Sequence, residues 1–235
     1  MIKKNKKRLK FLIVFTLAAV LGIGVTLALL RDVTETKKNT FASNKKISLL
    51  LREPSWDGYE FADESTSNGQ SAKPGITGDA LKALGVEKAA QYVPGEIIPK
   101  NPQVKNSGNK ETGVPIYAAV KVQFIDDTDT QVTYEEFKNR YLTSAGITFN
   151  TEHWKELATD TTDKLYMYKE ILAPGEDTSS APLFSEVPIS LELMPDSASG
   201  LFPQFRIKVT AYAIQSEYVK EPENEMLKFV KGITK

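Results

Sequence analysis

The sequence contains no cysteine and one histidine, His153. The absence of cysteine excludes disulfide bonds, thiolate metal sites and cysteine nucleophiles. Zinc proteases of the H-E-x-x-H type need two histidines on one helical face, and serine hydrolases of the common α/β type carry a G-x-S-x-G turn. Neither pattern is present, so we expect no enzyme and no cofactor. The residues leave open one zinc site, in which His153 would act with carboxylates such as Glu152 or Glu156.

Acidic residues are absent from the first 28 positions, which hold six of the 30 basic residues. Without this segment the chain has 24 basic and 30 acidic residues, a net charge of −6. Proteins that bind nucleic acid need clustered Lys and Arg to attract phosphates. The rest of the chain has no such cluster, so we expect no nucleic-acid partner.

The N-terminus has the order of a secretory leader. A basic stretch is followed by an apolar run that begins at Phe11 and is weakened by Gly22 and Gly24. Thr26 and Ala28 are small residues in the spacing that a signal peptidase reads, which predicts a signal peptide over residues 1–28 and cleavage before Leu29. The alternative is an uncleaved anchor over residues 11–30, long enough to span a bilayer. In both cases the basic flank stays inside, so the remainder lies outside the cell.

Alternation of apolar and polar residues predicts most of the remaining structure. Period-two patterns of this kind are typical of half-buried strands. Polar turn-rich stretches separate them, which indicates an antiparallel sandwich instead of βαβ units. The expected strands are 204–213, 116–125 (with Lys121 and Gln123 outward), 187–193, 47–51 and 165–172, the last paired with 147–149 or with the segment at Trp154.

Three short helices are expected between the strands. Residues 79–90 are good helix formers around a central glycine, and Thr133 stands three residues before Glu136, the pattern of a capping box. Pro222 occupies the first position of a last helix. Residues 62–78 read as a polar loop, and Pro94-Gly95 as a turn.

One aromatic residue and one cluster of acidic residues are candidates for a binding role. Trp56, in "EPSWD", is expected to plug the core or a sheet edge, with stacking on a glycan as the sharper alternative. Asp126, Asp127 and Asp129 carry the hard oxygens that calcium prefers, but they lack the spacing and the glycine of an EF-hand. A solvated loop is therefore the expectation there, and no metal site is assigned.

Three motif groups occur in a fixed order along nearly the whole chain. They are "TLALLRDVTETKKNTFAS" leading to "LREPSWDGYE", then "YVPGEIIPKNPQVKNSGNKETGVPIYAAVKV", and then "YKEILAPGEDTSSAPLF" with "FRIKVTAYAIQSEYV". In this order and spacing the chain resembles the TasA/camelysin group of exported proteins, in particular its BsaA-type branch. One departure is that the aromatic pair common after the cleavage site is replaced by Leu29 and Leu30.

The resemblance implies a fold, a processing enzyme and a role. The fold is all-β, an antiparallel jelly-roll-like β-sandwich with short helical insertions behind an N-terminal signal or anchor helix. A SipW-type signal peptidase would release the protein, and members of the group polymerise into extracellular fibres by donating an N-terminal strand to the next subunit. Camelysin-type relatives described as metalloproteases supply a further alternative.

The residues after the cleavage site fit a donated strand. Leu29, Leu30, Val33 and Phe41 would be exposed apolar residues at a new N-terminus, and an exposed sheet edge is a template for such a strand. We therefore expect residues 29–43 to form the donor strand, within a segment 29–45 that precedes a sandwich domain over 46–235. The alternative is an ordinary first strand that folds into its own domain.

These expectations combine into one functional hypothesis. The protein is a secreted structural subunit of matrix or cell-surface fibres, with itself as partner and the membrane contacted only through the leader. A monomeric cell-surface binding protein is the main alternative, and a camelysin-like metalloprotease is another.

Overall fold

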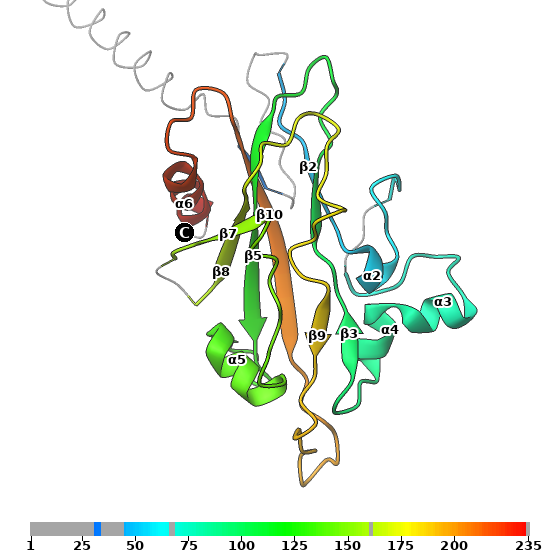
Figure 1. The fold of residues 1–235 in the computed structure, drawn as a ribbon. Helices are drawn as coiled ribbons and strands as arrows, with labels where there is room; N and C mark the ends of the chain where they lie inside the picture. Colours follow the sequence, from blue (N-terminus) through cyan, green and yellow to red (C-terminus); the bar gives the residue numbers. More distant parts are fainter. Residues whose placement is uncertain (1–30, 34–44, 66–68, 160–161, 234–235) are drawn as a thin grey trace, which may run out of the picture.

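A computed structural model describes residues 31–33, 45–65, 69–159 and 162–233 of the chain. This part is built mainly of antiparallel strands with a few short helices, as the alternation predicted (Figure 1). The strands are β1 (Arg31–Val33), β2 (Leu49–Arg52), β3 (Ile97–Pro99), β4 (Gln103–Asn106), β5 (Ile116–Ile125), β6 (Gln131–Val132), β7 (Trp154–Leu157), β8 (Lys164–Tyr168), β9 (Glu186–Pro188) and β10 (Arg206–Gln215).

The central ladder joins β5 and β10 over ten residue pairs, from Ile116↔Gln215 to Ile125↔Arg206. Both strands lie where period-two alternation predicted them. Alternate residues of each strand point into one core, as the pleat of a strand requires. In the described part of the chain these strands are the centre of a six-stranded sheet in the order β1-β10-β5-β8-β7, with β6 paired to β5.

Two short ladders form a second layer over one face of this sheet. β2 pairs with β4, and β3 pairs with β9, and their inward side chains join the core of the main sheet (Figure 1). The shared core includes Leu49, Val104, Ile98 and Val187, each at most 5% exposed. The arrangement is therefore two β layers around one apolar interior, with the second layer made of separate pairs instead of one continuous sheet.

The expected helices are present, but one of them is divided into two. The segment 79–90 forms α3 (Gly78–Ala83) and α4 (Gly85–Ala90), which change direction at Leu84. A Cβ atom on Gly85 would lie 1.9 Å from the carbonyl oxygen of Pro99 and 2.6 Å from Trp56 Cε3, so only glycine permits this close approach. A short α2 (Pro54–Asp57) precedes them.

The other two helices confirm their sequence signals. α5 (Tyr134–Tyr141) begins with the predicted capping box between Thr133 and Glu136. α6 (Pro222–Ile233) begins at the predicted proline and buries Met226, Phe229 and Val230. These three side chains form a second apolar cluster with Tyr212 and Ile214 of β10, so α6 covers the far face of the main sheet.

Three strand expectations need correction. The segment 187–193 is a strand only to Pro188, and Leu191 is 78% exposed, because no neighbouring strand continues beside it in the described chain. The strand expected over 165–172 is β8, it ends at Tyr168, and its partner is β7 at Trp154. Lys121 was expected to face solvent but is buried, where it pairs with Asp163 and lies over the ring of Tyr212.

Two further findings concern the ends of the strands and the leader. The segment expected at 47–51 is strand β2, which begins two residues later and ends one residue later than expected. Among the helices described here, none is both long enough and apolar enough to cross a membrane. The leader over residues 1–28 lies outside the described residues.

Candidate functional site

The outer edge of β10 is divided into two parts. β1 pairs with the end of the strand, in the register Arg31↔Ile214 to Val33↔Tyr212. Within the described residues no strand pairs with Arg206–Thr210 on that side, although β5 pairs with them on the other. The first half of β10 is therefore an open sheet edge, the kind of surface on which another strand can add.

The direction of the backbone groups along this edge can be derived from two contacts. Ser216 N donates to Pro115 O, and Ile116 exchanges hydrogen bonds with Leu172 on the side of β8. Because bonding direction alternates along an antiparallel strand, the even residues of β10 bond to β5. Ile207 and Val209 accordingly present their N–H and C=O groups toward the open side.

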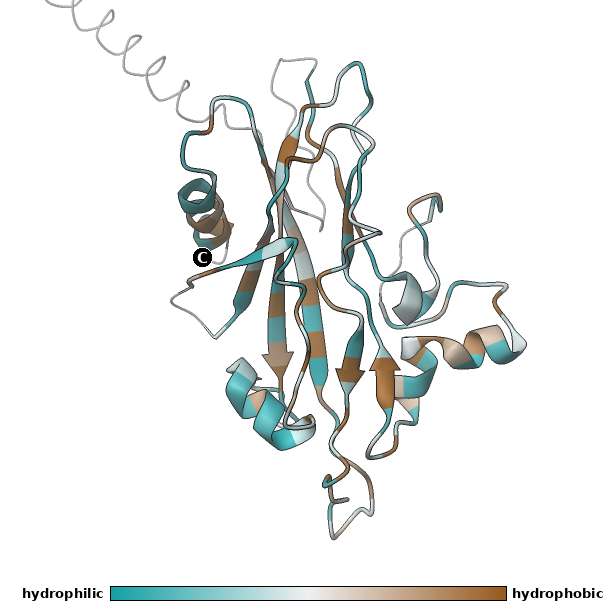
Figure 2. Ribbon diagram, in the orientation of Figure 1, coloured by the Kyte–Doolittle hydropathy of each residue, from teal (hydrophilic) through white to brown (hydrophobic). Residues whose placement is uncertain are grey.

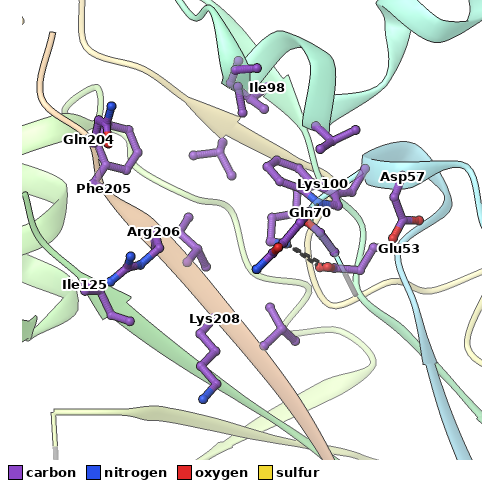
Figure 3. Close-up of a pocket in the computed structure, with 18 of the residues that line it drawn as sticks. Glu53, Asp57, Gln70, Ile98, Lys100, Ile125, Gln204, Phe205, Arg206 and Lys208 are labelled. Carbon is purple, nitrogen blue, oxygen red and sulfur yellow. Dashed lines mark hydrogen bonds and ion pairs between the residues drawn. The ribbon is translucent and has the colours of Figure 1, made fainter. Parts of the chain in front are cut away.

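A groove of about 1530 Å³ runs along this open edge. One wall is the first half of β10, and the other is formed by β2, α2, α4 and β3 (Figure 3). Ile98, Val187 and Ile189 belong both to its lining and to the core. The groove thus opens directly onto the apolar interior between the two layers.

Apolar side chains of the walls are incompletely covered. Phe205, Ile207 and Val209 of the β10 segment point into the core but are only partly buried, as is Leu51 on the opposite wall. Burial of apolar area contributes roughly 25 cal/mol per Å². A strand inserted here would gain both this term and the backbone hydrogen bonds of the edge.

The wall opposite β10 also holds a buried ion pair. Both carboxylate oxygens of Glu53 lie 2.8 Å from Nζ of Lys100, and Lys100 is 5% exposed. The same ammonium lies 4.5 Å from the centre of the Trp56 ring, a cation–π contact. Figure 3 shows Glu53 and Lys100 on this wall, across the groove from Arg206 and Lys208.

Trp56 is a core plug, as its context indicated. It is partly buried, packs against the core, and donates its indole N–H to the Gly69 carbonyl at 2.7 Å. One face of its ring is occupied by Lys100. The glycan-stacking alternative would therefore need Lys100 to move.

Tyr92 closes the end of the groove nearest the start of β10. Its hydroxyl donates to the Pro203 carbonyl at 2.6 Å, and its ring packs against Phe202 and Phe205. Burial, followed by the fields of Tyr141 and Asp127, raises the pKa of Tyr92 to about 12. The phenol is therefore protonated and remains a donor across the physiological range.

The residues expected to act at the N-terminus are placed only in part. Thr26, Ala28, Leu29, Leu30 and Phe41 lie outside the described residues. Val33 lies in β1, so its backbone is paired with β10 of its own chain, beside the open half of the same edge. The structure thus pairs three residues of the expected donor segment, 31–33, with β10 in cis, next to the open half of its edge.

The aspartate-rich loop is exposed from Asp127 to Thr130, as expected, but Asp126 at its start is buried. Asp126 is 5% exposed and accepts hydrogen bonds from Thr128, from the Thr130 amide and from Arg140. These bonds, the one from the Thr128 hydroxyl foremost, hold the pKa of Asp126 below its usual range. Asp129 is ion-paired with Arg206, so this loop anchors the first residue of β10.

The candidate zinc ligands do not converge in the described structure. His153 stacks on Tyr168, and Glu156 binds Lys164 and the Tyr166 hydroxyl. No group of three or more His, Cys, Asp or Glu side chains in the described ranges is arranged to hold a metal ion.

The groove itself was not predicted from the sequence. The alternation in 204–213 did identify Phe205, Ile207 and Val209 as inward residues, but it contains no signal for the missing neighbour on one side. The pairing of Lys100 with Glu53 joins positions 47 residues apart, which periodicity cannot show.

Comparison with known proteins gives no independent assignment: no family model, no curated protein and no solved structure matches this chain.

Proposed function

We propose that the protein is a secreted structural subunit of extracellular fibres, and that its groove accepts the N-terminal strand of a neighbouring subunit. The observation that carries the proposal is the open half of β10, where two core-facing side chains, Ile207 and Val209, are only partly buried beside an edge without a partner strand in the described chain. A donated strand would cover these side chains and would also form hydrogen bonds with the open edge.

The donor in this proposal is the segment 29–43, freed by a SipW-type signal peptidase that cuts after Ala28. The pairing of β1 with β10 supports the direction of donation, because residues 31–33 fit this edge in antiparallel orientation. Three residue pairs are a short ladder, and isolated short pairings have little stability in water. Replacement of β1 in cis by a longer strand in trans is the exchange that we propose.

The fold in this proposal is a jelly-roll-like sandwich completed in the fibre. As described, the second layer consists of two separate ladders, β2–β4 and β3–β9. A strand placed between β10 and β2 would extend the main sheet toward the second layer. No catalytic role is included, and the protein is assigned to the cell surface or matrix.

Deletion of residues 29–41 tests the proposal. The arm-deleted protein should remain a folded monomer with an empty groove, and electron microscopy should show no filaments. Mixed at a low ratio with intact protein, it should shorten the filaments, because it can accept a strand but cannot donate one. Filaments of unchanged abundance from the deleted protein would refute donation by this arm.

Matched substitutions separate the groove from the rest of the surface. Ile207→Glu places a charge in the groove, whereas Ile233→Glu places the same side chain at an exposed position of α6 that does not line the groove. We expect only the first to prevent filaments. If the protein is instead a monomeric binding protein, the main alternative, neither variant nor the parent protein would form filaments.

A further inference from the structure

A cluster of exposed apolar side chains lies at one end of the molecule. We call it the apolar tip, and it consists of residues from the turn before β3, from the first position of β3 and from the loop between β9 and β10. Figure 2 shows these two segments of the chain at the same end of the ribbon. Their exposed fractions range from 49% to 78%, and the members are Val93, Ile97, Leu191, Met194 and Leu201. Large apolar side chains that gather on a surface commonly mark a contact site.

Contacts between its two segments fix the shape of the tip. Gly95 adopts a left-handed φ of 86°, and a Cβ atom there would lie 3.0 Å from Leu191 Cδ1. The main chain of Ile97 pairs with Pro188, and Asp196 N donates to Leu201 O at 2.8 Å. The apolar side chains are therefore held by a folded scaffold and presented outward.

The longer of the two segments of the tip carries charge of one sign, and the shorter one holds Glu96, which is paired with Lys88. Residues 186–205 contain no Lys or Arg and include Glu186, Glu192 and Asp196. Hydrogen bonds from Ser199, followed by the Ala198 amide, hold the pKa of Asp196 below its usual range, so it is ionised at neutral pH. An apolar surface with acidic neighbours suits a partner that combines apolar and basic residues, and it disfavours an anionic lipid surface.

The tip adjoins the proposed acceptor groove. Leu201 belongs to the tip and also lines the groove, together with Phe202 and Gln204 of the same loop. The loop leads directly into Arg206, the first residue of β10, whereas β1 enters at Ile214, eight residues away. At about 3.4 Å per residue these two ends are roughly 27 Å apart.

The direction of β1 determines which part of a donor meets the tip. A donated strand that is antiparallel to β10, as β1 is, runs toward Arg206 and leaves the groove beside the tip. In the register of β1, residues 35–39 of the donor would pair with Arg206–Thr210, so the rest of the donor segment, from Thr40 to Lys46, meets the tip. This stretch contains Phe41, two lysines and no acidic residue, which complements the acidic neighbours of the tip.

We infer that the apolar tip is a second contact between fibre subunits, which binds the basic segment after the donated strand of the neighbouring copy. This inference rests on the proposed function, since it takes the direction of strand donation from it. The tip and the groove then act in sequence along one donor: the groove binds its first residues, and the tip binds the continuation.

The double substitution Leu191→Glu with Met194→Glu tests the inference. Both side chains are 78% exposed, so the fold should tolerate the change, which circular dichroism checks. Ile233→Glu, at an exposed apolar residue of α6, is the matched control. We expect the double variant to raise the protein concentration needed for filaments by about tenfold or more, as loss of a central apolar contact does, and the control to leave it unchanged.

A peptide assay separates the tip from the groove. The arm-deleted protein is titrated with labelled peptides of residues 29–39 and 29–46. The tip variant should bind the shorter peptide as the parent does and the longer one more weakly. Equal affinity of parent and variant for the longer peptide, or an unchanged filament threshold, would overturn the inference. If neither peptide binds but the tip variant still weakens filament formation, strand donation into the groove is wrong and the tip contact stands. A parent protein that never forms filaments contradicts both proposals.

Discussion

The two halves of β10 differ in burial although one strand, β5, pairs with both. From Ala211 to Ile214 every residue is buried, because β1 pairs along this half and α6 covers its outer face. From Arg206 to Thr210 no residue is fully buried, although Ile207 and Val209 are as apolar as the residues of the covered half. The difference comes from the neighbours of each half and not from its own sequence, and it locates the place where a further strand can bind.

The largest effect is expected at the ion pair on the groove wall opposite the open half. Lys100→Ala removes the partner of Glu53 and leaves a buried carboxylate, which typically costs about 3–5 kcal/mol of unfolding free energy. Lys100→Met combined with Glu53→Leu should recover most of this loss, because no buried charge is left. Urea unfolding of the single and double variants measures both. If the single and the double variant lose the same free energy of unfolding, the loss comes from altered packing of the wall and not from an unpaired buried charge.

The next effect concerns the covered half of β10. Ile214→Ala should lower the free energy of unfolding by about 2–5 kcal/mol, because Ile214 is fully buried and the truncation leaves a cavity under α6. Chemical denaturation of the purified domain measures the change.

The corresponding truncation in the open half should be milder in the monomer. Ile207→Ala removes a side chain that is only partly buried, so we expect a loss of about 1 kcal/mol. If Ile207→Ala and Ile214→Ala destabilise the monomer equally, the open half is closed in solution and the comparison fails. Within filaments the Ile207→Ala loss should increase, since the donated strand would bury this position.

The smallest expected effect is on the pH dependence of stability, and it concerns Asp126 in the loop that is ion-paired with the start of β10. The pKa of Asp126 is depressed in the folded protein, mainly by the Thr128 hydroxyl. Its contribution to stability is therefore complete above its unfolded value of about 4 and is lost as the pH falls through the folded value. Asp126→Asn should flatten the decline of stability in that acidic range. An unchanged acid profile in thermal melts would contradict this assignment.

The elements that could be predicted are those whose signal is local. β5, β10 and the capping box of α5 can be read from alternation and from residues three apart, and all are present. The segment 187–193 alternates equally well, but its ladder with β3 ends at Pro188 and, within the described residues, Ile189 keeps only a single bridge, to Leu142, because strand formation also requires a continuous neighbour. The segment 79–90 breaks at Leu84, and the glycine that follows it is required by the carbonyl of Pro99, which is distant in sequence.

The candidate site was predicted on one side only. The apolar residues after Ala28 indicated a donor strand, which stays a prediction. The proposed acceptor is an edge of β10 that lacks a partner strand within the described chain, and a missing partner produces no pattern in a sequence. The same reason explains why Trp56 was placed correctly as a plug while its contact with Lys100 was not foreseen.

Amide hydrogen exchange at Ile207 and Val209, in the monomer and in assembled fibres, tests the central claim most directly. These amides point to the open side of β10, so they should exchange rapidly in the monomer and slow by about a hundredfold or more in fibres, when a donated strand accepts their hydrogen bonds. The amides of Lys208 and Thr210, which bond to β5 in both states, are the internal reference. Equal exchange of Ile207 and Val209 in monomer and fibre would show that no strand binds this edge.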